Sequence, residues 1–275
     1  IYCLNSFSIN SFKFFENNFK KRLFYLFVTI LNPTFLLWCT SLRWYSLWTP
    51  LALYVIGKYF FKKKLNELDI FLILIAFTIM FHLNYFTLIF IISLVFSNYK
   101  KFFENFYFFI KNKPHFFIIL ILLNLPQFYY FLTTHILNSS SQYGSFLFSF
   151  LYPVITSIFG NSVFPLEIVS LLFFFTLLMT IFYNFKFYKK TNLEFKNLIS
   201  FFLIFFLLIF LLRLGHKPRH SIILNYLFIF FFFLNLLYLK NEIFKNIFLI
   251  IFFIFSLIGI KNTILQQNVI KNNIN

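Results

Sequence analysis

Residue types that can bind phosphate recur at the ends of long apolar runs in this sequence. Arg43 stands between two such runs, and a cluster of Arg, Lys and His follows a third run that ends at Leu212. Guanidinium groups give paired hydrogen bonds to phosphate, and ammonium groups add point charges. We therefore predict a site for an anionic phosphate or pyrophosphate lipid headgroup. Its candidate residues are Arg43, Tyr45, His82, Arg213, Lys217, Arg219 and His220.

Two other interpretations of these residues stay open. The cations could be ordinary interface residues, whose long side chains extend from helix ends into water. A divalent metal could be bound by His216 and His220 together with His82 or Glu167, but Pro218 between the first two disfavours a regular helix face. We expect no resident cofactor. We also find no Ser-His-Asp set and no Gly-rich phosphate loop.

The composition predicts how these residues are positioned. The chain has 275 residues, of which 61% are hydrophobic and 11% are charged, against about 25% charged in soluble domains. The net charge is +17, but the cations lie in short clusters between apolar runs, as in cytoplasmic loops, and this excludes a basic nucleic-acid-binding domain. We predict an all-α, polytopic transmembrane helical bundle, with residues 1–275 as one transmembrane domain and no soluble domain.

The beginning of the sequence and its cysteines add little chemistry. Cys3 and Cys39 are the two thiols, and they indicate neither a disulfide framework nor a metal motif. The sequence begins at Ile1 rather than at Met, without the pattern of a signal peptide. We expect this chain to be the C-terminal part of a larger integral membrane protein.

The distribution of Lys and Arg predicts a path of about nine membrane crossings, because cytoplasmic loops carry an excess of these residues. Six of the 24 Lys and Arg then lie outside, together with four of the five histidines, while Glu167 is the acid nearest that face. Residues 135–165, which lack Lys and Arg, also lie outside. The predicted crossings occupy residues 23–40, 44–61, 69–97 (a hairpin of two crossings), 116–134, 166–184, 198–212, 221–239 and 247–260.

Residues 69–97 are predicted to form a short hairpin rather than a single crossing. Lysines 62–64 precede this run, and a basic loop with Lys100, Lys101, Lys111 and Lys113 follows it, so both ends belong on the same side. The tip is predicted within residues 81–85, around His82. Each arm of about 14 residues measures about 21 Å, less than the hydrocarbon core of about 30 Å. We therefore expect the tip to lie in a recess within protein.

Four landmarks resemble the membrane glycosyltransferases of the GT-C superfold, a group that includes protein mannosyltransferases and lipid A aminoarabinose transferases. Asn32-Pro33 followed by Arg43-Trp44-Tyr45-Ser46-Leu47 resembles a Pro-bearing helix that leads to an Arg-x-Tyr-x-Leu turn. Met80-Phe81-His82-Leu83-Asn84-Tyr85 resembles the Tyr-Thr-His-Tyr hairpin tip of that family. Residues 143–160 resemble its outer amphipathic segment, and Arg219-His220 resembles an Arg-Tyr pair before a late helix. The resemblance covers residues 23–240, with departures at Phe81, His220 and Asn225.

This resemblance implies a transfer reaction in the membrane. The enzyme would move a sugar from a polyprenyl-phosphate-linked donor to an acceptor on the extracytoplasmic side, with Arg and Lys binding the phosphate. The family's catalytic base is an acid in the first outer loop, which we expect upstream of this fragment, so no residue here is assigned that role. The implied partners are the lipid bilayer and the donor, and the implied location is the cell membrane, as a multi-pass protein.

Two alternative functions remain. A polysaccharide polymerase is also polytopic and carries arginines on the outer side. A flippase or transporter of lipid-linked sugar is the non-enzymatic alternative, and it would carry broken helices near the middle of the bilayer and internal repeats. We find no repeats of that kind in the sequence.

Overall fold

A computed structural model describes Phe7, residues 44–62, 64–136 and 193–212, and scattered helical residues within 223–231 and 242–261. The chain is divided into two compact units, each described by itself. The first unit contains Phe7, residues 44–136 and residues 193–212, and the second contains the described residues from 223 onward. The described residues form helices joined by short turns, with no strand among them, which confirms the all-α prediction for this part of the chain.

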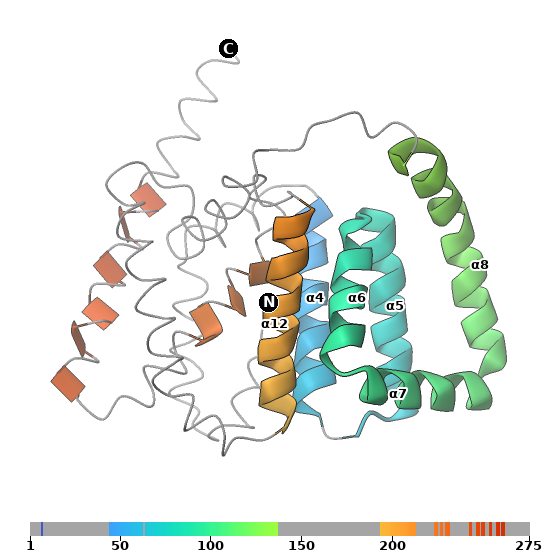
Figure 1. Ribbon diagram of the computed structural model, residues 1–275, viewed down its shortest axis with the longest axis horizontal. Coiled ribbons are helices and arrows are strands. Elements are labelled where there is room, and N and C mark those ends of the chain that lie inside the picture. The colour runs from blue at the N-terminus through green and yellow to red at the C-terminus, as the bar shows by residue number, and fades with distance from the viewer. Residues whose placement is uncertain are drawn as a thin grey trace, which may run out of the picture. The chain divides into compact units, whose positions relative to one another are not determined.

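The first unit is a bundle of helices with one helix set across its end (Figure 1). Helices α4, α5, α6 and α12 lie side by side, α7 runs across the end of α5 and α6, and α8 stands at the far end of α7. Their bounds are α4 Trp44–Phe61, α5 Glu67–Leu83, α6 Phe86–Ser97, α7 Tyr99–Asn112, α8 Pro114–Tyr130 continuing into the π-helix η1 Phe131–Ile136, and α12 Leu193–Leu211.

The predicted break within the hairpin is confirmed, because α5 ends at Leu83 and α6 begins at Phe86. The backbone of Asn84 is extended, and its side-chain oxygen accepts a hydrogen bond of 2.7 Å from the backbone N–H of Phe86. The rings of Phe77 and Phe90 meet with centroids 6.4 Å apart, as expected for two antiparallel arms. The arms have 17 and 12 residues, so they measure about 25 Å and about 18 Å.

The unequal arms are explained by the start of α5. Asn66 is the N-cap: its side chain accepts a bond from the backbone of Asp69, and the carboxylate of Asp69 accepts one from the backbone of Asn66. This reciprocal capping box satisfies two backbone donors that have no partner within the helix. It starts α5 at Glu67, before the predicted apolar run.

The prediction of a basic loop after the hairpin was wrong, since residues 99–112 form helix α7. Asn98 ends α6 and caps α7, its side chain accepting a bond of 3.1 Å from the backbone N–H of Lys101. The two helices meet at an angle of 108°. Apolar residues recur along α7 with helical spacing, and this periodicity marks an amphipathic helix despite the lysines.

Aromatic side chains form the core of the first unit. Phe90 of α6 is fully buried, with ring centroids 5.7 Å from Trp48 of α4, and 5.4 Å and 6.1 Å from Phe201 and Phe205 of α12. Trp48 also donates a buried hydrogen bond of 2.8 Å to the hydroxyl of Thr87. Helix α12, predicted as a crossing at 198–212, therefore packs against α4 and α6.

Among the described residues, one helix is long and apolar enough to cross a membrane. It spans Pro114–Thr133, with a mean hydropathy of 1.8, and none of its most apolar stretch is buried. The bent pair α6 and α7 would provide a second candidate span if the two helices together form one crossing. Residues Lys196–Leu211 form a shorter apolar helix. The path of about nine crossings stays a prediction. Its segments at 23–40, 135–165 and 166–184 lie essentially outside the described residues.

The second unit is described only in part. Its helical residues within 223–231 are buried, among them Leu224, Leu227 and Phe230. Those within 242–261 are exposed or half-buried, and Ile243, Ile250 and other large apolar side chains are among them. That residues 1–275 form one transmembrane domain stays a prediction.

Candidate functional site

The charged side chains that the structure describes in the first unit gather at one end of its helices. Phe60 contacts Phe201 with ring centroids 5.6 Å apart, and Trp48 contacts Phe86 at 5.6 Å, so α4 ends and α12 begins at the end away from the hairpin tip. We call this the basic end, and we call the opposite end the tip end. The described Lys, Asp and Glu of the unit belong to the basic end: Lys58, Lys62, Lys64, Glu67, Asp69, Lys100, Lys101, Glu104, Lys111, Lys113, Glu194 and Lys196.

The predicted site residues divide into those that the structure describes and those that it does not. His82 lies at the tip end, and Tyr45 belongs to the first turn of α4, which begins there. Arg43, Arg213, Lys217, Arg219 and His220 lie outside the described residues. In the sequence, Arg43 directly precedes α4, and Arg213 follows Leu212, the last described residue of this unit. That the arginines meet stays a prediction.

His82 is exposed on the last turn of α5 and faces α8. Its Nε2 lies 3.1 Å from the backbone carbonyl oxygen of Leu123. Because a carbonyl oxygen only accepts hydrogen bonds, Nε2 donates in this contact. In the neutral ring, Nδ1 is then the acceptor, and it suits a hydroxyl group of a ligand.

Two further polar contacts join the hairpin to α8. Asn124 donates from Nδ2 to the hydroxyl of Thr78 at 3.0 Å, and Gln127 donates to the hydroxyl of Tyr85 at 3.1 Å. Between apolar helices such bonds contribute about 0.6–2 kcal/mol each. The hairpin tip is therefore packed against protein on the α8 side, as expected from its short arms.

Sequence reasoning missed the polar residues of α8. Asn124 and Gln127 are three residues apart in an otherwise apolar run, so they share a helix face. Polar side chains within an apolar span mark helix contacts or ligand paths, and this signal could have identified both residues.

An apolar groove runs beside this interface, with a volume of about 370 Å³. Its walls come from α5, α6, α7 and α8, and it reaches from Phe102 at the basic end to Phe81 and Phe128 near the tip end. Thr78 and Asn124 are the polar residues of its lining. The Oδ1 atom of Asn124 is buried and, within the described part of the chain, has no hydrogen-bond partner. The groove suits a hydrocarbon chain.

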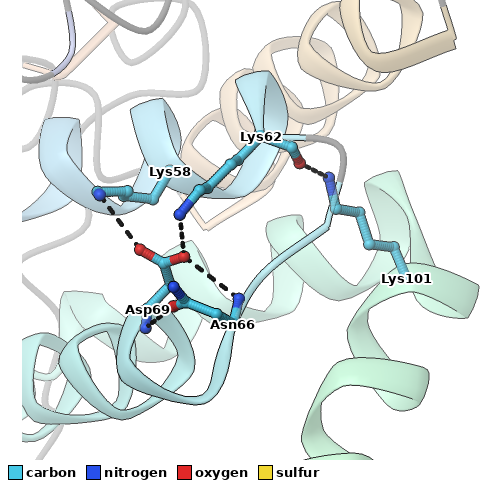
Figure 2. Close-up of polar contacts among 5 residues, drawn as sticks. All are labelled: Lys58, Lys62, Asn66, Asp69 and Lys101. Atoms are coloured by element: carbon cyan, nitrogen blue, oxygen red, sulfur yellow. Dashed lines mark hydrogen bonds and ion pairs between the residues drawn. The ribbon is translucent and has the colours of Figure 1, made fainter.

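Among the described residues, the carboxylate with the most hydrogen bonds lies at the other end of the unit (Figure 2). Asp69 is 4% exposed, and it accepts bonds from Lys58 at 3.2 Å, from Lys62 and from the backbone of Asn66 at 3.2 Å. Lys101 of α7 donates to the backbone carbonyl of Lys62 at 2.8 Å. These bonds connect α4, α5 and α7. We therefore assign Asp69 a role in stabilising the fold.

Metal ligands do not gather in the part of the chain that the structure describes. No group of three or more His, Cys, Asp or Glu side chains able to hold an ion occurs among those residues. His216 and His220, the pair considered for a metal, lie outside them.

Comparison with known proteins gives no relative. No protein-family model matches the chain, and neither a curated protein nor a solved structure matches it. An assignment of function therefore rests on the residues and their arrangement.

Proposed function

We propose that this chain belongs to a multi-pass membrane glycosyltransferase, which binds a polyprenyl-phosphate-linked sugar and transfers the sugar on the extracytoplasmic side. One observation carries the proposal. The polar tip of the α5–α6 hairpin lies beside an apolar groove, at the end of the unit where the described residues include no Lys, Asp or Glu. A lipid-linked sugar has the same division, with a polar head on a long hydrocarbon chain.

The described lysines lie at one end of the first unit, and this distribution supports an orientation of the unit in the membrane. Lysines concentrate on the cytoplasmic side of membrane proteins, so the basic end would face the cytoplasm and the tip end the outside. The exposed apolar surface of α8, including Leu122 and Leu123, would face lipid. This orientation agrees with the sidedness that the predicted path of about nine crossings gives to the first unit.

We propose separate roles in donor binding for the groove of the first unit and for the residues predicted from the sequence. The polyprenyl chain would lie in the groove between α5 and α8. Arg43, Arg213, Lys217 and Arg219 would bind the phosphate, and Tyr45, His82 and His220 would line the sugar site. His82 is suited to this role, because its contact with Leu123 leaves Nδ1 as an acceptor for a sugar hydroxyl.

We expect residues 85 and 100 to lie on opposite sides of the bilayer. Tyr85→Cys and Lys100→Cys would each be introduced after Cys3 and Cys39 are replaced by Ser, and probed in intact cells with an impermeant thiol reagent. The expected result is labelling of residue 85 from outside and of residue 100 only after permeabilisation. Labelling of residue 100 alone in intact cells would show that the orientation is the reverse of the proposed one, and it would disprove the outer site.

Removing Arg43 is expected to weaken donor binding. A charge-assisted hydrogen bond to phosphate contributes about 1.5–3 kcal/mol, so Arg43→Ala and Arg219→Ala should each raise the donor Kd about ten- to a hundredfold. Arg43→Lys should restore only part of this loss, since an ammonium group lacks the planar fork. The measurement is titration of the purified protein, in lipid nanodiscs, with a polyprenyl-phosphate sugar.

The matched control is Lys64→Ala, which removes an exposed cation from the basic end. It should leave the donor Kd unchanged. Equal affinities for all the Arg43 and Arg219 variants and for the starting protein would contradict the proposed phosphate site. Full recovery in Arg43→Lys would favour the interpretation that this residue is an ordinary interface cation.

A further inference from the structure

Helix α7 has two faces of different chemistry. Lys100 and Lys111 are eleven residues apart, close to three turns, so they lie on the same side of the helix, and both are exposed. Glu104 lies between them on that side. A second, apolar side, about 110° round the helix from the lysines, carries Tyr99, Phe103, Phe106 and Ile110 at helical spacing. Tyr99 and Phe103 are 69% and 60% exposed.

The apolar side of α7 is only partly covered by the protein. Phe109 is buried against Phe71 of α5, with ring centroids 6.4 Å apart. Next to this contact, α7 and Phe117 of α8 line a second groove of about 610 Å³. Its walls also include Phe103, Phe106 and Ile110 from the apolar side of α7, and Glu104 and Tyr107 from the side of the lysines. Aromatic side chains next to an open groove leave room for a hydrocarbon chain.

The direction of α7 relative to its neighbours matches a helix lying in a membrane surface. It leaves α6 at 108° and crosses the end of the bundle where the described lysines gather (Figure 1). Lys101 holds this elbow by donating to the carbonyl of Lys62. An amphipathic helix perpendicular to apolar helices, with lysines on its polar side, fits the layer between lipid headgroups and acyl chains.

We propose that α7 is a binding surface for anionic phospholipid in the leaflet at the basic end. Lys100 and Lys111 bind the lipid phosphates, and an acyl chain enters the groove between α7 and α8. Charge favours an anionic lipid over a zwitterionic one, because Lys100 and Lys111 outnumber Glu104 on this face, and Lys113 and Lys64 lie at the same end. The inference rests on the membrane orientation of the proposed function, but it does not depend on sugar transfer.

The test uses the whole chain, with Cys3 and Cys39 replaced by Ser, in vesicles of phosphatidylcholine and phosphatidylglycerol. A fluorophore on Phe103→Cys is quenched by nitroxides carried on the acyl chain of either lipid, at matched amounts. Quenching by the phosphatidylglycerol nitroxide should exceed quenching by the phosphatidylcholine nitroxide, and this preference should weaken in high salt. Lys100→Gln and Lys111→Gln should each lower the relative affinity for phosphatidylglycerol about fivefold.

Two matched variants test whether the effect belongs to this face. Glu104→Gln removes the acid between the lysines and should strengthen the preference. Lys196→Gln removes an exposed lysine of the same end from α12, and should leave the preference unchanged. An unchanged preference in the double variant Lys100→Gln, Lys111→Gln would overturn the proposal, as would equal quenching by the two lipids in the starting protein.

A second label separates this inference from the proposed function. A fluorophore on Leu122→Cys of α8 should be quenched by nitroxides deep in the acyl chains. Quenching at residue 122 without quenching at residue 103 would overturn the surface on α7 and leave the membrane orientation standing. Absence of quenching at both positions would contradict the membrane orientation itself.

Discussion

Replacing Asp69 by alanine is expected to lower the free energy of unfolding by about 3.5–4.5 kcal/mol. Breaking a buried ion pair costs about 3–5 kcal/mol, and losing a helix cap adds about 0.5–2 kcal/mol. The lower part of the combined range applies, because the side chains of Lys58 and Lys62 are 23% and 39% exposed and keep part of their hydration. The measurement is reversible unfolding by denaturant in lipid–detergent micelles.

Two variants separate the contributions at Asp69. Asp69→Asn removes the charge but keeps a side-chain oxygen for the cap, so it should cost less than Asp69→Ala. Glu67→Gln changes a neighbouring acid whose partner is Asn112 at 3.0 Å, on the exposed side, and it should cost about 0.5 kcal/mol or less. An Asp69→Ala variant as stable as Glu67→Gln would show that the ion pairs do not hold this end together.

Phe90→Ala is expected to lower the free energy of unfolding by about 3 kcal/mol. Substitutions of this kind cost about 3–5 kcal/mol in soluble cores, as the sum of a transfer term and a cavity term. In the proposed membrane orientation the transfer term is small, because lipid chains are as apolar as the core. The cavity term remains, since Phe90 contacts the ring of Trp48 on α4 and the rings of Phe201 and Phe205 on α12.

The control for Phe90 lies on the same helix. Phe96 is 71% exposed, so Phe96→Ala removes the same ring without opening a cavity, and its effect should stay within about 0.5 kcal/mol. The same unfolding titration compares the two variants. Equal losses would mean that general helix propensity, rather than packing between α4, α6 and α12, sets the stability of the unit.

The fold was predictable where polarity interrupts apolar runs. The polar residues around His82 marked the hairpin break, because a backbone turn needs partners that an apolar run lacks. Helix α7 was not predicted, because its lysines are typical of a cytoplasmic loop. The helical spacing of its aromatic residues, which indicates a helix, was overlooked. The mean hydropathy of a run also hides single polar residues, and for this reason Asn124 and Gln127 escaped notice.

The candidate site was predictable only in outline. Charge asymmetry predicted that His82 lies opposite the lysines, and the first unit shows that arrangement. The contact of His82 with Leu123 was not predictable, because a backbone carbonyl carries no signature in the sequence and becomes a partner only through helix packing. Whether Arg43 and Arg219 meet depends on long-range packing, which a single sequence does not encode in any local pattern.

Because α12 contributes to the aromatic core, this core can be completed only after α12 has been synthesised. Phe201 and Phe205 emerge from the ribosome about a hundred residues after Phe90, which at 5–20 residues per second is a delay of about 5–20 s. During that interval the surface formed by Trp48, Phe86 and Phe90 has no α12 to cover it. A nascent chain of this protein therefore needs another apolar partner for this surface until α12 has been synthesised; in the proposed membrane orientation, that partner is lipid or the insertion machinery.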